Sequence, residues 1–270
     1  MSDEQARAHD DLVAELRVLG VRPGQDLLVH SSLRCIGPVA GGAATLLRAL
    51  QTAAGPDATL VVPAETPGNS LSSRFFREQT AGLSAAALEH FVAAMPGFDP
   101  ASTPSDGMGA FAEYVRTTPG AIRSAHPQTS FAALGPGAAD CTAGHQMTCH
   151  LGEQSPLSWL YRANAAAILL GVGYASCTAL HLAEYLSPVQ PRRRLYRCFT
   201  RADGARREHA FYDIDLDETD FDTIGVQLDR QAIAQRGRVA NAADCRLLPI
   251  RDAVDFAAAW PPFRQRRAVR

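Results

Sequence analysis

Apolar and polar positions alternate along the first quarter of the chain in a way that predicts helices and strands in turn. Residues 10–20 repeat leucines at helical spacing and end in a glycine, which predicts a helix that stops there. The short apolar run at 26–30 predicts a strand, residues 41–55 a helix, and the run "ATLVVPA" at 58–64 a second strand. This order is typical of a β-α-β unit.

The alternation continues beyond a long, Pro- and Gly-rich excursion at 65–104, whose length suggests a functional role. We expect helices at 84–94, 108–120, 155–163, 177–186 and 221–235 and before Trp260, and strands at 129–134, 165–173, 238–242 and 245–250. The Asp-Gly in "RADGA" predicts a hairpin between 194–200 and 206–214. The fold class is therefore α/β, with a mixed sheet flanked by helices.

Composition fits one domain over residues 1–270. The chain is 46% hydrophobic with a formal net charge of −2, enough apolar surface for a substantial core. A pI near 6.4 and scattered arginines predict no nucleic-acid partner. Neither a signal peptide nor a membrane span is predicted, so we expect a soluble cytoplasmic protein with no membrane partner; the oligomeric state is left open.

Six cysteines without a CxxC pair predict buried, reduced thiols. Cys141, His145, Cys149 and His150 have spacings that could form a zinc site. Their segment is rich in Gly and Thr and lacks a second ligand pair at a typical separation. We therefore expect a surface loop and no metal.

Two hydroxyl-rich loops accompany predicted strands. His30, Ser31 and Ser32 end the first strand, where ligands usually bind in α/β sheets, and small hydroxyls with free N–H groups favour phosphate oxygens. The alternative is that the serines only satisfy local turn groups. The loop at 123–131 precedes another strand and adds a cation, an imidazole and hydroxyls, so that together the loops favour an anionic cofactor.

In addition to these two loops, the helix expected after the buried strand at 165–173 carries a pair of titratable residues. His181 and Glu184 are three residues apart, so the carboxylate can stabilise the imidazolium, as a general base requires. The alternative is a packed histidine beside a solvated acid.

Four ordered blocks resemble the aminoglycoside 3-N-acetyltransferase family over nearly the whole chain. They are 30–64 with "HSSLRCIG", 98–136, 152–184 with "LHLAE", and 211–225 with "FYDIDLDETD". The resemblance implies a fold distinct from the small GNAT acetyltransferases. It also implies acetyl-CoA-dependent acetylation of the 3-amino group of a 2-deoxystreptamine ring, by direct transfer, with antibiotic resistance as the consequence and no metal.

The resemblance also implies roles for particular residues. His181 would be the general base, with Glu184 orienting it and Asp213 as a second acid. Acetyl-CoA would be bound by Ser31, Ser32, Leu33, Met108, Gly109, Ser124, His126 and Ser130. Because the acceptor is polycationic, carboxylates should line its pocket, and the candidates are Glu65, Asp99, Asp213 and Asp215.

The chain departs from the family pattern at Ala175, where members often carry an acid, which predicts a less anionic pocket and a narrower acceptor range. Two other enzyme hypotheses remain. One is acylation of a different amine, and the other is a ping-pong reaction through Cys177, four residues before His181. A non-catalytic module that sequesters acyl-CoA or an antibiotic is the third alternative.

Overall fold

A mixed seven-stranded sheet forms the centre of the computed structural model, which describes residues 7–189 and 192–260. The strand order is β3-β4-β2-β1-β5-β9-β8. Its strands are β1 (Leu27–Ser31), β2 (Leu60–Pro63), β3 (Ile122–Arg123), β4 (Phe131–Leu134), β5 (Ala166–Leu170), β8 (Gln235–Val239) and β9 (Ala242–Pro249). β1 pairs in parallel with β2 and β5, and the other pairings are antiparallel. The expected α/β class with a mixed sheet is confirmed.

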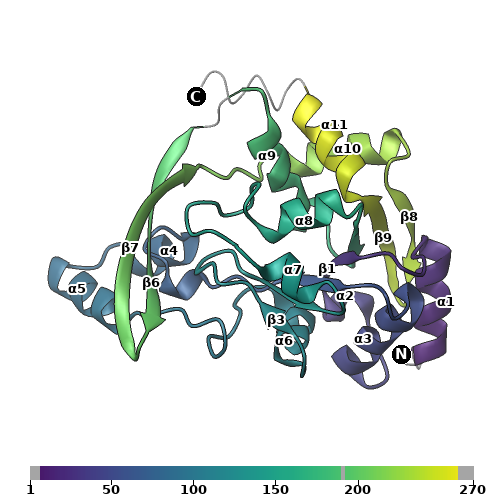
Figure 1. The fold of residues 1–270 in the computed structure, drawn as a ribbon, viewed down its shortest axis with the longest axis horizontal. Coiled ribbons are helices and arrows are strands. Elements are labelled where there is room, and N and C mark those ends of the chain that lie inside the picture. Colours follow the sequence, from purple (N-terminus) through teal and green to yellow (C-terminus); the bar gives the residue numbers. More distant parts are fainter. Residues whose placement is uncertain (1–6, 190–191, 261–270) are drawn as a thin grey trace.

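Helices cover both faces of this sheet (Figure 1). One face carries α1 (His9–Leu19), α3 (Gly42–Ala54) and α6 (Gly109–Thr117). The other carries α7 (Ala138–Thr142), α8 (Pro156–Arg162), α9 (Leu182–Leu186), α10 (Phe221–Arg230) and α11 (Ile250–Ala259). Each helix buries one apolar face against the strands, which produces a three-layer arrangement.

Strand β1 is buried on both sides because it lies in the middle of these layers. Leu27 and Val29 pack into the core beneath α1, α3 and α6, whereas Leu28 between them packs into the core on the other side. This alternation follows from the two-residue period of a strand. It explains why the sequence of β1 is apolar throughout until His30.

The hairpin predicted from the Asp-Gly turn is confirmed, but it forms a separate two-stranded sheet. β6 (Arg193–Ala202) and β7 (Ala205–Ile214) join through Asp203 and Gly204, whose φ angles of 53° and 74° are left-handed, as such two-residue turns require. Figure 1 shows the hairpin as a long arm beside α4 (Arg74–Thr80) and α5 (Ala85–Ala94).

Most expected elements are present, with differences at their ends. The helix expected at 177–186 begins with a 3-10 turn, Thr178–His181, before α9, and another 3-10 turn, Tyr174–Ser176, precedes it. Short elements that the pattern did not predict are α2 (Leu33–Ile36), the 3-10 turn Pro67–Asn69, α4, α7 and β3. Segments of two to seven residues carry too few periodic positions to be recognised.

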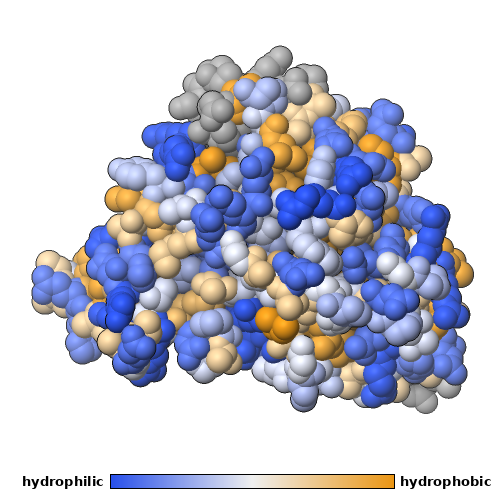
Figure 2. Space-filling view, viewed as in Figure 1, coloured by the Kyte–Doolittle hydropathy of each residue, from blue (hydrophilic) through white to orange (hydrophobic). Residues whose placement is uncertain are grey.

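No helix within the described ranges is both long and apolar enough to cross a membrane. Figure 2 shows hydrophilic side chains spread over one face of the molecule between smaller apolar areas.

Candidate active site

A cavity of about 660 Å³ opens where β1, β2 and β5 end. These three strands are parallel neighbours, so their carboxyl ends meet at one edge of the sheet. Beyond that edge, the chain leaves β1 toward one helical layer and β5 toward the other. This divergence is the kind of point at which α/β sheets bind ligands.

One side of the cavity is formed by the turn after β1 and by the start of α6. Ser31, Ser32, Leu33, Met108 and Gly109 all line it, five of the eight residues expected to contact the coenzyme. Ser32 also caps the short helix α2, because its Oγ accepts a hydrogen bond from the Cys35 N–H at 3.3 Å. Gly109 has φ of 84°, and a Cβ there would lie 3.4 Å from the Ser31 carbonyl oxygen, so glycine permits the close approach of α6.

The other three residues expected at the coenzyme, Ser124, His126 and Ser130, do not line the cavity. Ser124 accepts a hydrogen bond from the Phe131 N–H, and Ser130 donates to the Ala64 carbonyl at 2.7 Å. All three are buried and hydrogen-bonded within the protein. Ser130 thus joins the loop 123–131 to the end of β2, whereas Ser124 and His126 join the loop to His145 and Met147.

His181 and Glu184 lie together on the opposite side of the cavity. The His181 Nδ1 atom is 3.5 Å from the Glu184 Oε1 atom, and Glu184 is fully buried. Glu184 Oε1 also accepts a hydrogen bond from the Asp217 N–H, and the edge of the Phe221 ring packs against the imidazole at 4.6 Å between centroids. The ring thus packs against Phe221 and lies at ion-pair distance from Glu184 without a hydrogen bond from Nδ1 to any described residue, and His181 lines the cavity.

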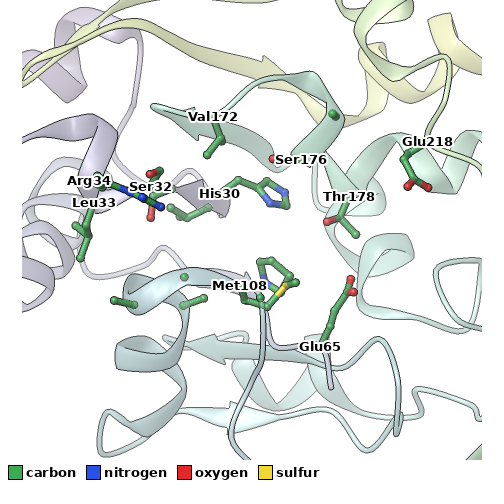
Figure 3. A pocket seen from close by; sticks show the side chains of 18 of the residues that line it. His30, Ser32, Leu33, Arg34, Glu65, Met108, Val172, Ser176, Thr178 and Glu218 are labelled. Carbon is green, nitrogen blue, oxygen red and sulfur yellow. The ribbon is translucent and has the colours of Figure 1, made fainter. Parts of the chain in front are cut away.

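Two carboxylates lie near this imidazole. Glu65, one of the expected acceptor ligands, lines the cavity after β2, and Glu218, which the sequence did not single out, lines it from the loop before α10. Burial raises the pKa of Glu65 to about 7; the Glu218 carboxylate raises it too, whereas the imidazole of His181 opposes the shift. Figure 3 shows Glu65 and Glu218 across the cavity from Ser32 and Leu33.

Asp213, expected as both a catalytic and an acceptor-binding acid, does not line the cavity. Its Oδ2 atom accepts hydrogen bonds from the His150 Nδ1 and the Tyr185 hydroxyl, each at 2.7 Å. Burial alone would raise the pKa of Asp213, but these hydrogen bonds lower the pKa by more than burial raises it, so that the net shift is downward. Asp213 is thus a buried anchor between the hairpin and the loop that carries His150.

The two other expected acceptor ligands also lie outside the cavity lining. Asp99 accepts hydrogen bonds from the Ala101 N–H and the Ser102 hydroxyl within its own loop. Asp215 lies 3.6 Å from Arg194. Of the four acids proposed for the acceptor, the structure brings only Glu65 to the cavity.

The expectation that the Cys141–His150 segment is a surface loop was wrong, because all four candidate ligands are buried. His145 hydrogen-bonds Ser124 and the His150 carbonyl, and His150 hydrogen-bonds Asp213. Within 7–189 and 192–260, no three His, Cys, Asp or Glu side chains are arranged to hold a metal. All six cysteines are free thiols, and Cys35 is exposed, contrary to expectation.

Sequence reasoning missed several residues that line the cavity. Arg34 lies beside Ser32 and Leu33, Thr178 and Glu218 lie on the other side of the cavity, and His30 lies between them (Figure 3). His30 was noticed as part of its motif but was given no role. The sequence contained a signal for a role of His30, because a titratable side chain at the end of an apolar strand lies either in the core or at a ligand site.

A mixed sheet covered by helices on both faces, with a polar cavity at the ends of its parallel strands that is lined by a histidine beside a buried glutamate, is typical of an enzyme. The family model for aminoglycoside 3-N-acetyltransferases matches residues 28–261. Aminoglycoside N(3)-acetyltransferase VII of Streptomyces paromomycinus is 35% identical over 267 residues, which span 92% of this chain and 89% of the relative. The chain belongs to the aminoglycoside 3-N-acetyltransferase family and is an acetyltransferase.

Solved structures of related enzymes share this fold. AAC-VIa bound to sisomicin superimposes with a TM-score of 0.83 at 33% identity, covering 98% of this chain and 100% of that one. AAC-IIIb in its binary complex with CoASH gives a TM-score of 0.82 at 26% identity, covering 95% and 96%. Acetyl-CoA, the co-substrate expected from the sequence, fits this family.

Proposed function

We propose that this chain transfers the acetyl group of acetyl-CoA directly to the 3-amino group of a 2-deoxystreptamine aminoglycoside, with His181 as the general base. The observation that carries the proposal is the position of His181. It lines the cavity, lies 3.5 Å from the buried Glu184, and its imidazole is close enough to Glu65 to lower the pKa of that carboxyl. A histidine so placed, beside carboxylates that attract a cation, suits deprotonation of an ammonium group.

The chemistry requires a base because an aminoglycoside amine is largely protonated near neutral pH. Its nitrogen can attack the thioester carbonyl carbon only when its lone pair is free. In the proposed step, His181 accepts the ammonium proton, the freed lone pair forms the C–N bond, the C–S bond breaks, and the second proton that the nitrogen loses passes to the thiolate of coenzyme A. Glu184 stabilises the imidazolium during transfer, and its 3.5 Å separation from the ring is compatible with tightening when substrate binds.

The two sides of the cavity suit two different substrates. Arg34 and the hydroxyl-bearing turn Ser31–Ser32 provide cationic and hydrogen-bonding groups for the phosphates and pantetheine of acetyl-CoA. Glu65 and Glu218 provide the negative field that a polycationic acceptor needs. The solved relatives with CoASH and with sisomicin support binding of both classes of ligand. Antibiotic resistance would be the consequence for the host.

The structural position of Cys177 favours direct transfer over a ping-pong reaction. Cys177 is fully buried, and it is not among the residues that line the cavity. Burial raises the pKa of its thiol to about 12, so that hardly any thiolate forms near neutral pH. An acetyl-cysteine intermediate is therefore not part of the proposal.

Release of coenzyme A thiol on mixing the protein, acetyl-CoA and a panel of 2-deoxystreptamine drugs tests this function. We expect His181→Ala to lower turnover at least about a hundredfold with little change in acetyl-CoA affinity, because general-base catalysis contributes roughly 10²–10⁴. Cys177→Ala should retain most of its turnover, and no acetyl-enzyme should be trapped in the parent protein. His90→Ala, on the exposed surface of α5, is the matched histidine control.

Each alternative predicts a different result. Near-parental turnover by His181→Ala would remove it from the mechanism, whereas loss of turnover in Cys177→Ala together with a trapped acetyl-enzyme would favour ping-pong chemistry. Thiol release with simple amines but with no aminoglycoside would indicate a different acceptor. Tight ligand binding without thiol release would indicate a sequestering module.

A further inference from the structure

His30 is a buried histidine with an unused ring nitrogen in the middle of the cavity. It is the penultimate residue of β1, only 5% exposed, and it lines the cavity. Its Nε2 atom makes no hydrogen bond to any residue in the described parts of the chain. Figure 3 shows the imidazole extending from β1 into the space between Ser176, Thr178 and Met108.

The other three buried histidines differ from His30, because both nitrogens of each have partners. Those partners are Gln128 N–H and the Met147 carbonyl for His126, Ser124 and the His150 carbonyl for His145, and Asp213 and Gln128 for His150. A buried polar atom without a partner costs about 1–3 kcal/mol. The three buried histidines away from the cavity use both nitrogens, whereas His30, like His181 at its Nδ1, has a nitrogen with no partner among the described residues and lines the cavity, so the unused Nε2 of His30 points to a ligand.

The charge state of the His30 imidazole limits the kind of ligand that it can bind. Burial lowers the pKa of His30 to about 4, so the ring is neutral at neutral pH and can donate one N–H without supplying a full positive charge. A neutral donor is poorly suited to an ammonium group but well suited to a carbonyl oxygen. Such a donor also does not compete with His181 for the proton of the acceptor.

The position of His30 selects the acyl group among possible ligands. On one side lies the turn Ser31–Leu33, where the proposed function places the coenzyme, and on the other lies the side of the cavity with Glu65 and Glu218 (Figure 3). An acetyl group passing from coenzyme to amine must occupy the space between these sides. That is the space the imidazole of His30 faces.

We infer that His30, protonated on Nε2, donates a hydrogen bond to the carbonyl oxygen of the acetyl thioester and stabilises the negative charge that develops there. As the amine nitrogen bonds to the carbonyl carbon, the C=O π electrons move onto this oxygen, and His181 takes the amine proton. When the carbonyl re-forms, the C–S bond breaks, and the thiolate of coenzyme A takes the second proton that the nitrogen loses in becoming an amide. His30 is thus a second catalytic residue, and its role rests on the proposed function.

Kinetics and infrared spectroscopy of His30 variants test this inference. We expect His30→Ala to lower kcat about 10²–10³-fold with little change in the acetyl-CoA KM, because removing one oxyanion donor has an effect of that size. His30→Gln, whose amide nitrogen can lie near the position of Nε2, should recover part of the loss. With acetyl-CoA labelled with ¹³C at the carbonyl, the bound C=O stretch should shift to lower frequency in the parent and lose that shift in His30→Ala.

His90→Gln serves as the histidine control, and circular dichroism with a thermal melt checks that each variant is folded. A folded His30→Ala protein with parental kcat and an unchanged carbonyl frequency would overturn the inference while the proposed function stands. Equal losses in His30→Ala and His30→Gln with a parental carbonyl frequency would also overturn it. If the parent releases no thiol with any aminoglycoside, the proposed function itself fails.

Discussion

At the scale of single residues, Glu65 shows how neighbours set the charge of the proposed acceptor site. Its pKa is raised to about 7 by burial, with the Glu218 carboxylate acting in the same direction. The free enzyme therefore holds Glu65 partly protonated near neutral pH. A cationic acceptor favours the ionised form, so acceptor binding and ionisation of Glu65 are coupled.

Glu65→Gln should raise the acceptor KM about tenfold at pH 8, since a lost contact between ammonium and carboxylate costs roughly 1.5–3 kcal/mol before solvent screening. The difference from the parent should shrink as the pH falls below about 7, where Glu65 is already protonated. The acetyl-CoA KM should stay constant. Steady-state kinetics from pH 6 to 8.5, with Glu89→Gln on the exposed surface of α5 as the control, measure both effects.

Glu65→Gln should weaken acceptor binding but stabilise the fold. A carboxyl whose pKa is raised in the folded protein favours the folded state only when it is protonated. That stabilisation is lost as the pH rises from the unfolded pKa, near 4.5, through about 7. Glu65→Gln should therefore gain more unfolding free energy relative to the parent at pH 8 than at pH 5.

A Glu65→Gln variant with a parental acceptor KM at pH 8 would exclude Glu65 from acceptor binding.

At the scale of elements, the turn Tyr174–Ser176 determines which side chains line the cavity after β5. Ala175 is exposed and lines the cavity, and its N–H donates to the Asp222 Oδ1 atom at 3.1 Å. Asp222 comes from the first turn of α10. This helix thus holds the turn in place, while the side chain at 175 adds no charge.

Ala175→Asp should lower the acceptor KM about fivefold or more for at least one poorly used aminoglycoside, since one added contact to an ammonium is worth on the order of 1–3 kcal/mol. The acetyl-CoA KM should not change. Ala175→Asn is the matched neutral control, because it adds the same volume without the charge. Kinetics across a panel of 2-deoxystreptamine drugs provide the measurement.

A broad parental acceptor range together with an unresponsive Ala175→Asp variant would contradict this prediction. If Ala175→Asp and Ala175→Asn change the acceptor KM equally, the cause is the added side-chain volume and not the charge. Because Asp222 lies close to the turn, Ala175→Asp also adds a like charge beside it. A thermal melt of both variants separates that effect from acceptor binding.

At the scale of the whole molecule, buried histidines join the hairpin, the loop 123–131 and the sheet into one unit. His126 and His145 stack at 4.7 Å between ring centroids, and His150 packs against Tyr196 of β6 at 4.2 Å. Burial lowers the pKa of His145 to about 4 and that of His126 well below its usual range. Together with His30, these rings are neutral in the folded protein.

Mild acid should therefore destabilise the protein through these histidines. A histidine with a lowered folded pKa contributes full stability above its unfolded pKa, near 6.5, and loses it as the pH falls toward the folded pKa. His30, His126 and His145 together should lower the unfolding free energy by up to about 4 kcal/mol per pH unit below pH 6, at about 1.4 kcal/mol for each proton. Protonation of Glu65, whose raised pKa has the opposite sign, offsets up to about 1.4 kcal/mol per pH unit of this loss. Urea unfolding between pH 7.5 and 5 measures this slope.

His90→Gln should follow the parental pH profile, because His90 lies on the exposed surface of α5. An unfolding free energy that stays constant from pH 6.5 to 5 would contradict the predicted role of the buried rings. His150 is left out of the sum because its contact with Asp213 opposes the effect of burial on its pKa.

The sequence by itself determined the order of the longer elements, the turn at Asp203–Gly204, and the pairing of His181 with Glu184. These features depend on contacts between residues close in the chain, where a period of 3.6 or 2 and a turn signature are sufficient. The family resemblance, carried by four blocks in order, is now confirmed by the match over residues 28–261. The turn Ser31–Leu33 and the start of α6 were likewise placed at the cavity in advance.

Only the tertiary structure decided which polar loops reach the cavity. Ser130 and Asp213 lie on segments as polar as those that carry Ser32 and Glu218, yet their side chains point into the protein interior. The direction of each depends on what packs across from it, such as Tyr185 and His150 for Asp213, and these partners are distant in sequence. The unpartnered Nε2 atom of His30 also depends on residues distant in sequence, because only the folded structure shows that no neighbouring segment supplies a hydrogen-bond partner in the described parts of the chain.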